Sequence, residues 1–271
     1  MPRTIAGAFF GALLTVAPVT FTGAAAEEAE GKKEEWHAPF GGRWNAYFTF
    51  ATDYSYAGIS NTMNQPAYQF SLDWRSPYLN EDRTVWAYAG TFGSNIAFPA
   101  TGPGVEVDFF GGVKTRLFDR KLKFDLGYFR YLYPGTPAEL GYEYGEIGFQ
   151  VDYDFGPLTV SGRLRHSRNF FGNSGQSWQK RARIGVPLDF LPLPDSVSIQ
   201  AYGALGNFWV DNFLADGLPS QDYWFWQIGF VTSAFGLDFH VAYTDTSISY
   251  EGCAHTHYCS ARAFFSVTKA F

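Results

Sequence analysis

Apolar and polar residues alternate along most of this chain. In the segment AYQFSLDW, the apolar residues Tyr68, Phe70, Leu72 and Trp74 occupy every second position, with polar residues between them. The segment VEVDFFGGVKTRL at 105–117 repeats the pattern. Because successive side chains of a β-strand point to opposite faces, each such segment predicts a strand with one apolar and one polar face.

The alternation predicts about twelve strands separated by turns and loops. We expect strands over residues 44–54, 65–75, 83–93, 104–117, 121–133, 141–155, 158–168, 177–189, 196–206, 222–233, 236–248 and 260–271. The connections after even-numbered strands include the short FDRK, GP and AFG, and those after odd-numbered strands include the long GNFWVDNFLADGLPSQ and SYEGCAHTHYCS. Short turns at one end and long loops at the other are typical of bacterial outer-membrane barrels, whose even strand number returns both termini to the periplasmic side.

The pattern therefore predicts an all-β fold, a transmembrane antiparallel β-barrel with short periplasmic turns and longer extracellular loops. A soluble β-sandwich also alternates, because its apolar face packs against a second sheet. The composition favours the membrane, since 20% of the residues are aromatic and only 17% are charged. No internal apolar run is long enough to predict a transmembrane helix.

The start of the chain predicts export. Arg3 precedes an apolar run, and three alanines ending at Ala26 precede an acidic stretch, which is typical of a signal peptide over residues 1–26. A retained anchor helix is the alternative. The charged segment 27–43 lacks periodicity and is expected to be a flexible arm, with a short plug entering a pore as its alternative. The barrel then occupies residues 44–271, in the outer membrane of a Gram-negative bacterium.

An ordered series of motifs runs along nearly the whole chain from Trp44. It comprises FATDYSYAGISNTMNQPAYQFSLDW, FGSNIAF, EVDFFGGV, DLGYFRYLYPG, YGEIGF and ARAFFSVTKAF. In this series the chain resembles the TorF-type porin family of Gram-negative outer membranes. The resemblance implies an outer-membrane barrel with a channel role and supplies no catalytic residues. That family commonly has an arginine before the glycine of the first loop and a glutamine after the serine, where this chain has Ala57 and Asn61.

Strand parity places four arginines inside the predicted barrel. Arg163 and Arg165 share the polar face of the seventh predicted strand, and Arg181 and Arg183 share that of the eighth. An arginine that faces lipid near the bilayer midplane costs about 2 to 4 kcal/mol, so all four side chains should point inward. They form a basic ladder on adjacent strands.

Other charged residues share the inward faces. The predicted pore lining also includes Lys114, Arg116, Glu146, Asp152, Asp108 and Asp125. In one interpretation, the acids and the arginines form a salt-bridge network that fills a closed lumen. In the other, part of the ladder lines a watery passage and attracts anions. The second interpretation predicts a porin-like channel for passive diffusion of small hydrophilic solutes, with a weak anion preference.

Aromatic residues cluster in YFRYLY at 128–133 and in YWFW at 223–226. Tyr and Trp prefer the depth of lipid headgroups, so both clusters predict girdles at the membrane interface. The inward members Phe129, Tyr131 and Tyr133 leave a second interpretation open, a sugar-stacking surface inside the pore.

Lipid hydrolysis is the rival function, because some barrels of this size hydrolyse lipids with a lipid-facing serine and histidine. The segment LRHSRNF brings His166, Ser167 and Asn169 together in sequence. Neighbouring residues of a strand point to opposite faces, so His166 and Ser167 cannot easily share a proton there. We therefore expect no enzymatic activity and no cofactor, and we expect His166 to lie in an aromatic girdle.

Cys253 and Cys259 are the two cysteines of the chain, and they flank AHTHY in a predicted extracellular loop. The oxidising compartment favours a disulfide that closes this loop. A metal site built from both thiols with His255 and His257 is the alternative.

The chain ends in ARAFFSVTKAF, in which Phe265, Val267 and Phe271 share one face. Bacterial barrels commonly finish on a strand with an outward terminal aromatic residue, so Phe271 is expected to act as an assembly signal. The expected partners are outer-membrane lipids, the barrel-assembly machinery and small hydrophilic solutes, and no nucleic acid is expected.

Overall fold

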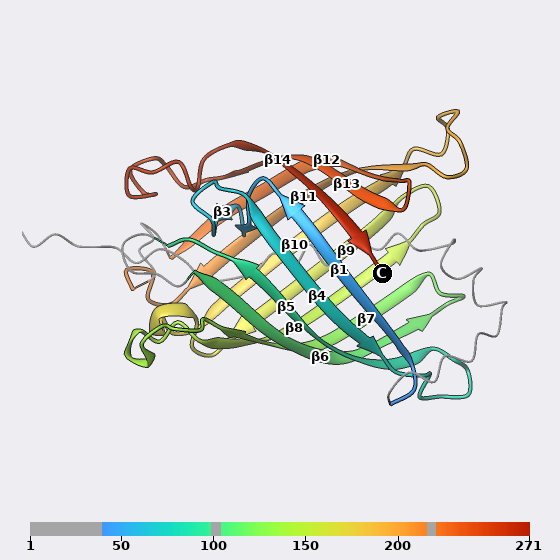
Figure 1. Ribbon diagram of the computed structural model, residues 1–271, viewed down its shortest axis with the longest axis horizontal. Helices are drawn as coiled ribbons and strands as arrows, with labels where there is room; N and C mark the ends of the chain where they lie inside the picture. The colour runs from blue at the N-terminus through green and yellow to red at the C-terminus, as the bar shows by residue number, and fades with distance from the viewer. Residues whose placement is uncertain (1–39, 99–103, 216–220) are drawn as a thin grey trace, which may run out of the picture.

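A computed structural model describes residues 40–98, 104–215 and 221–271 of the protein. The predicted signal peptide, and the predicted arm up to residue 39, lie outside these residues. Within them, twelve strands close into one antiparallel barrel, as the alternation predicts (Figure 1). The barrel strands are β1 (Arg43–Ala51), β4 (Ala67–Arg75), β5 (Val85–Asn95), β6 (Val105–Leu117), β7 (Leu122–Leu132), β8 (Tyr144–Asp154), β9 (Thr159–Ser167), β10 (Ser177–Pro187), β11 (Ser198–Val210), β12 (Asp222–Ala234), β13 (Leu237–Thr246) and β14 (Arg262–Ala270).

Each barrel strand pairs with the next, and β1 pairs with β14 to close the sheet. Near the closure Tyr47 lies opposite Ala270, and the Phe271 amide donates to the Ala46 carbonyl at 2.9 Å. Because the described barrel strands form a single closed sheet, the alternative two-sheet sandwich is wrong. Phe271 itself is 76% exposed, and its role in assembly stays a prediction.

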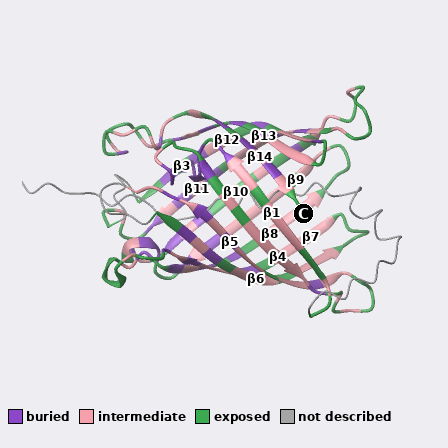
Figure 2. Cartoon of the chain, viewed as in Figure 1, coloured by how far each residue is buried: buried purple, intermediate pink, exposed green. Residues whose placement is uncertain are grey.

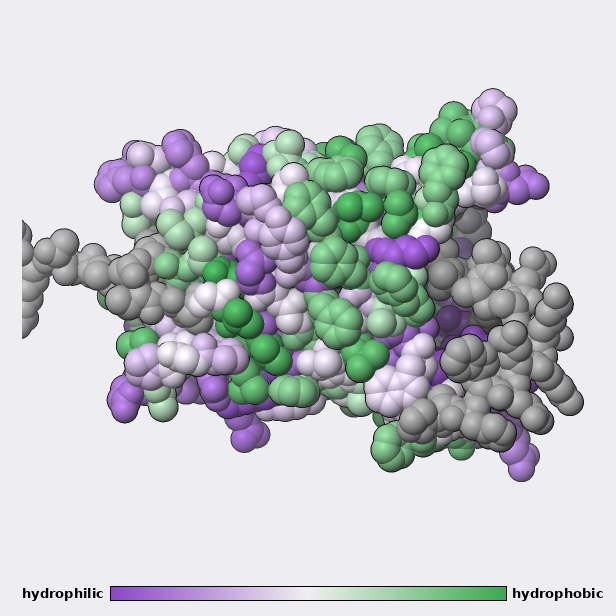
Figure 3. All heavy atoms as spheres, viewed as in Figure 1, coloured by the Kyte–Doolittle hydropathy of each residue, from purple (hydrophilic) through white to green (hydrophobic). Residues whose placement is uncertain are grey.

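The apolar face of the strands points outward. Tyr68 is 58% exposed and Phe70 is 49% exposed, on the face that the alternation assigns to them. Figure 3 shows hydrophobic side chains over the middle of the wall and hydrophilic ones toward the ends. Exposed apolar side chains on other strands include Val113, Leu126, Ile147, Ile184, Ile228 and Val241. Such a wall suits contact with lipid hydrocarbon.

The two ends of the barrel carry different connections. One end, the turn end, has the short connections 118–121, 155–158 and 235–236. The other, the loop end, has the long connections 133–143 and 247–261. This difference between the ends is the one that the sequence predicts.

Some connections contain short elements of their own. The 3₁₀ helices η2 (Ala138–Leu140) and η3 (Phe171–Asn173) lie in loop-end connections. No helix in the described ranges is long and apolar enough to cross a membrane. Two turn-end connections, 76–84 and 188–197, are longer than a tight turn.

The loop between β1 and β4 folds into the barrel. Its strands β2 (Ser55–Tyr56) and β3 (Ile59–Ser60) pair with each other, and we call residues 52–66 the inner hairpin. Between the two strands Gly58 has φ +84°, in the left-handed region that favours glycine. Figure 2 shows buried residues gathered at the loop end around this hairpin. The alternation of apolar and polar residues does not predict this hairpin.

The main core lies inside the barrel at the loop end. Tyr54, Tyr56 and Ile59 of the inner hairpin are each no more than 2% exposed. They belong to a cluster with aromatic side chains of the wall and of the loop-end connections, namely Phe92, Tyr131, Tyr133, Tyr144, Phe170, Phe171, Phe208 and Tyr223. Removing these rings from water stabilises the hairpin inside the lumen.

Candidate functional site in the barrel interior

Two tyrosines of the inner hairpin reach different parts of the wall. Tyr54 Oη donates a hydrogen bond to Glu106 Oε1 on β6 at 2.6 Å. Tyr56 Oη donates to Glu146 Oε1 on β8 at 3.4 Å, and the Tyr56 ring centre lies 5.9 Å from that of Phe208 on β11. The hairpin therefore crosses the interior from β6 to β11 and occupies the loop-end half of the lumen.

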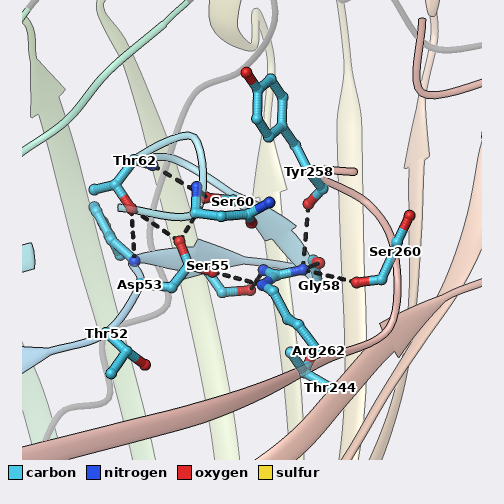
Figure 4. Close-up of polar contacts among 12 residues, drawn as sticks. Thr52, Asp53, Ser55, Gly58, Ser60, Thr62, Thr244, Tyr258, Ser260 and Arg262 are labelled. Carbon is cyan, nitrogen blue, oxygen red and sulfur yellow. Dashed lines mark hydrogen bonds and ion pairs between the residues drawn. The ribbon is translucent and has the colours of Figure 1, made fainter. Parts of the chain in front are cut away.

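Arg262, the first residue of β14, ties the inner hairpin to its surroundings (Figure 4). Its Nε lies 2.6 Å from Asp53 Oδ2, and its Nη2 donates to Ser55 Oγ at 2.9 Å. Its Nη1 donates to the Gly58 carbonyl at 2.9 Å and to two carbonyls of the 247–261 loop at 3.2 Å. One guanidinium thus joins the hairpin, the wall and a loop-end connection.

Asp53 is also held by hydroxyl groups of the hairpin. Its Oδ1 accepts hydrogen bonds from Ser60 Oγ at 2.5 Å and from Thr62 Oγ1 at 2.8 Å. The side chains of Asp53 and Arg262 are 4% and 11% exposed, so the ion pair is shielded from water. Removing either partner of such a buried ion pair strongly destabilises the fold, because the other charge is left buried without compensation.

Arg165 is the buried member of the predicted arginine ladder. Its Nη1 lies 3.3 Å from Glu146 Oε2 and donates to Tyr131 Oη at 2.6 Å, while Tyr131 Oη donates to the same carboxylate at 2.8 Å. The guanidinium carbon lies 4.1 Å from the centre of the Phe129 ring. A carboxylate, a hydroxyl and an aromatic face surround this charge, which makes Arg165 part of the packed half of the interior.

Three glycines make room for this packing. Gly112, Gly127 and Gly148 lie side by side on β6, β7 and β8, next to Arg165 on β9. A Cβ atom at Gly148 would lie 2.9 Å from Phe129 Cε2, closer than real Cβ contacts. Because glycine has no Cβ atom, the ring of Phe129 can lie against the wall at Gly148.

Arg163, Arg181 and Arg183 lie nearer the turn end and are only half-buried. Arg163 and Arg181 face each other directly across β9 and β10. Each guanidinium donates to a glutamine side-chain carbonyl, at 2.9, 3.2 and 3.4 Å respectively. Within the described ranges, none of the three forms an ion pair. Three positive charges therefore lie together without an acidic partner in the described part of the chain.

The turn-end half of the interior is polar and partly exposed. Lys114 Nζ lies 3.3 Å from Asp125 Oδ2, and Lys123 Nζ lies 3.3 Å from Asp152 Oδ2. These side chains are 19% to 33% exposed, so water reaches them. Arg116 lies over a tryptophan ring of β5, with its guanidinium carbon 5.2 Å from the ring centre.

The structure places the predicted pore-lining residues in the interior, but it divides them between its two halves. Asp108, Glu146 and Arg165 are no more than 3% exposed, so in this conformation they line no watery passage. The inner hairpin occupies the space that an open lumen would leave beside them. Tyr131 and Tyr133 are buried in the same core and present no sugar-stacking surface.

The predicted disulfide is confirmed. Cys253 and Cys259 are bonded, with their Cα atoms 6.0 Å apart. The bond uses both thiols, so the alternative metal site is wrong. No group of three or more His, Cys, Asp or Glu side chains in the described ranges is arranged to hold a metal ion.

His166 and Ser167 point to opposite faces of β9. The His166 ring stacks on Trp178 with ring centres 4.2 Å apart, and its Nδ1 lies 3.0 Å from the Ser177 carbonyl oxygen. Ser167 is 1% exposed and points into the interior. The two side chains therefore do not form a nucleophile and base pair in this structure.

A protein-family model matches residues 39–271 and is described as a bacterial protein of unknown function (Gcw_chp). The chain belongs to this family. No curated protein matches the sequence. The Gcw_chp description names no function, so the resemblance to TorF-type porins stays a prediction.

The Gcw_chp chain is similar to several solved barrels. The NanC porin is 9% identical, with a TM-score of 0.46, 84% of this chain covered and 98% of that chain. LpxR from Salmonella typhimurium is 8% identical, with a TM-score of 0.43 and coverage of 84% and 99%. The translocator domain of the autotransporter NalP from Neisseria meningitidis is 12% identical, with a TM-score of 0.48 and coverage of 91% and 92%. At these identities the likeness says nothing about the activity of this Gcw_chp chain.

Sequence reasoning missed Asp53 and Arg262, the charged residues that anchor the inner hairpin. The alternation assigns each of them only a strand face or a loop, and they lie at opposite ends of the Gcw_chp barrel sequence. One signal was present in the sequence. The run SYAGIS at 55–60 breaks the alternation with small residues, and Gly58 marks a tight turn within it.

Proposed function

We propose that this Gcw_chp protein is an outer-membrane channel for the passive diffusion of small hydrophilic solutes, with a weak preference for anions. The observation that carries the proposal is the group formed by Arg163, Arg181 and Arg183, which lies inside the barrel with no acidic partner among the described residues. Arginine side chains along a pore wall attract anions and raise their local concentration.

The outer wall supports the membrane location. Phe109, Leu126 and Ile228 are 53%, 56% and 63% exposed, and they lie on three different strands. In water such a wall would be a large exposed apolar patch, whereas in a bilayer it meets lipid hydrocarbon. Outer-membrane lipids and the barrel-assembly machinery are then the partners, after export directed by residues 1–26.

The proposed path starts at the turn end. It follows the partly exposed ion pairs Lys114–Asp125 and Lys123–Asp152 and then the arginines of β9 and β10. Because the inner hairpin occupies the loop-end half, solute crosses only when the hairpin leaves the lumen. In this proposal the described conformation is the closed state.

A structural barrel with a permanently closed lumen is the second candidate. The observation that favours it is the Arg165–Glu146 pair, which is 3.3 Å apart and almost fully buried beneath the inner hairpin. In this alternative the hairpin never leaves. We propose no enzymatic role, since His166 and Ser167 point to opposite faces.

Planar-bilayer recordings on the refolded protein test the proposal. The wild type is expected to conduct, with a reversal potential in a salt gradient that indicates a weak anion preference. Replacing both Arg163 and Arg181 with glutamine should move the reversal potential toward cation preference, because it removes two charges from the wall. The matched control is Arg130→Gln, which removes an arginine from an exposed ion pair with Glu143 and should leave the reversal potential unchanged.

Two results would contradict the proposal. Silent bilayers with well-folded wild-type protein would decide for the closed structural barrel. Conduction with the same reversal potential in the wild type and the double variant would show that the ions do not pass along β9 and β10.

A further inference from the structure

We infer that Arg163, Arg181 and Arg183 form a binding site for a compact oxyanion, the carboxylate or phosphate group of a small solute. The inference deepens the proposed function and rests on it, because the channel would bring the solute to the site. It goes beyond a preference for anions, since it predicts saturable binding at one place in the lumen.

The first observation is the crowding of like charges. Arg163 and Arg181 are direct partners across β9 and β10, and Arg183 lies two residues further along the same face of β10. Side chains directly opposite each other on antiparallel strands have Cβ atoms about 4.5 to 5.5 Å apart. Like charges at that spacing destabilise the sheet unless a counter-charge lies between them.

The second observation is an excess of hydrogen-bond donors. The partners of the three arginines are the neutral side chains of Gln179, Gln227 and Gln200, which accept through Oε1. Several buried donors of this group have no acceptor within the described part of the chain, namely Arg163 Nε, Arg181 Nε, Arg183 Nε, Gln179 Nε2 and Gln200 Nε2. Buried donors are normally paired, so this group lacks an acceptor, and an oxyanion offers several at once.

The third observation is that the neighbouring acids already have partners. Glu146 accepts from Arg165 and Tyr131, and Asp152 accepts from Lys123 and Gln150. None of these carboxylates is left to neutralise the three arginines. The counter-charge is therefore expected to come from the solute.

The surroundings select a compact ligand. On the loop-end side lie the packed side chains of Phe129 and Arg165. On the turn-end side lie the partly exposed ion pairs Lys114–Asp125 and Lys123–Asp152. The guanidinium of Arg183 lies 4.3 Å from the centre of the Tyr202 ring, and a guanidinium held against an aromatic ring is suited to bidentate recognition of an oxyanion. A single carboxylate or phosphate group fits such an arrangement better than a long polymer.

Titration calorimetry on the detergent-solubilised, refolded full chain tests the site, with inorganic phosphate in one arm and acetate in the other at constant ionic strength. The wild type is expected to bind at least one of them saturably. The anion that binds more tightly indicates whether the natural solute carries a phosphate or a carboxylate group. Arg181→Gln should weaken this binding by about tenfold or more, since a charge-assisted partner is lost. Arg181→Lys, which keeps the charge without the planar fork, should weaken it less.

The Arg130→Gln variant should bind as the wild type does, and resistance of each variant to heat in detergent gels reports that it is folded. Absence of saturable binding to the wild type in both arms, or equal binding by the wild type and a folded Arg181→Gln, would overturn the site. The bilayer recordings separate this failure from that of the channel. If the protein conducts but binds neither anion, the proposed site is wrong and the proposed channel function stands. If the protein is silent but binds phosphate, the site stands and the channel function is wrong.

Discussion

The Asp53–Arg262 ion pair is the contact whose loss should release the inner hairpin most directly. Asp53→Asn is the smallest change that tests it, because it keeps the shape of the side chain and one carbonyl acceptor while it removes the charge. Arg262 Nε then loses a carboxylate at 2.6 Å, while Nη2 and Nη1 of the same guanidinium keep their bonds to Ser55 and Gly58. The hairpin remains attached, more weakly.

The expected magnitude follows from this geometry. Breaking a buried ion pair by removing one partner costs about 3 to 5 kcal/mol, and a hydrogen bond to a charged group contributes about 1.5 to 3 kcal/mol. Because asparagine still accepts from Arg262, we expect a loss of about 2 to 3 kcal/mol in the free energy of hairpin docking. At about 1.4 kcal/mol for each factor of ten, the undocked population should rise roughly 30- to 150-fold.

Thiol labelling measures that population. Ile59 of the inner hairpin is 1% exposed, so a cysteine introduced there should react only when the hairpin leaves the lumen. The two native cysteines are joined in the disulfide, which leaves the introduced thiol as the only reactive one. The labelling rate of Ile59→Cys, measured with and without Asp53→Asn, gives the change in the undocked population of the hairpin. The fraction of time that the channel spends open in bilayer recordings shows the functional consequence.

The matched control is Glu143→Gln, which breaks the exposed ion pair with Arg130 at 2.9 Å. Exposed ion pairs contribute only about 0.2 to 1 kcal/mol, and this one does not touch the hairpin. Equal labelling rates in the Asp53→Asn and Glu143→Gln proteins would refute the reasoning that the ion pair holds the hairpin. If Asp53→Asn speeds labelling but the bilayers still show no conduction, then the hairpin is not the gate.

Four further changes test the contacts inside the barrel. Arg262→Lys should raise the labelling rate as well, because an ammonium group cannot reach Asp53 and the carbonyls of the 247–261 loop together. Reducing the disulfide of that loop should raise the labelling rate less than Asp53→Asn, since it loosens the loop and leaves the ion pair. Asp108→Asn should preserve or raise the unfolding temperature in detergent, because both oxygens of that buried carboxylate lack a hydrogen-bond partner in the described ranges, and a fall would contradict this. Glu146→Gln should instead lower the unfolding temperature by the equivalent of about 2 to 3 kcal/mol, because it removes the negative charge beside the buried Arg165 while the glutamine oxygen still accepts from it.

The barrel could be predicted from the sequence because one rule governs every strand. A wall between an apolar outside and a polar inside must alternate, and this requirement is local to each segment. The segment at 104–117 was predicted from its alternation alone, and β6 covers Val105–Leu117. The same parity placed Tyr68 and Phe70 outside.

The inner hairpin could not be predicted in this way, because its position depends on residues far apart in the chain. Tyr56 packs between Phe170, which follows β9, and Phe208 of β11, with ring centres 6.3 and 5.9 Å away. Arg262 reaches Asp53 across more than two hundred residues of sequence. Periodicity describes one strand at a time and carries no information about such contacts.

The two arginines of β9 show the same limit at a finer scale. Arg163 and Arg165 lie two residues apart on one face, so parity treats them alike, yet among the described residues only Arg165 has an acidic partner. The carboxylate and the hydroxyl that contact Arg165 belong to Glu146 on β8 and Tyr131 on β7, and Tyr56 of the inner hairpin donates to the same Glu146 at 3.4 Å. Undocking the hairpin would therefore leave Arg165 neutralised by the wall. The opening of the channel and its anion preference then depend on different residues. Asp53→Asn should change how often the channel opens, but it should not change the reversal potential, which Arg163, Arg181 and Arg183 determine.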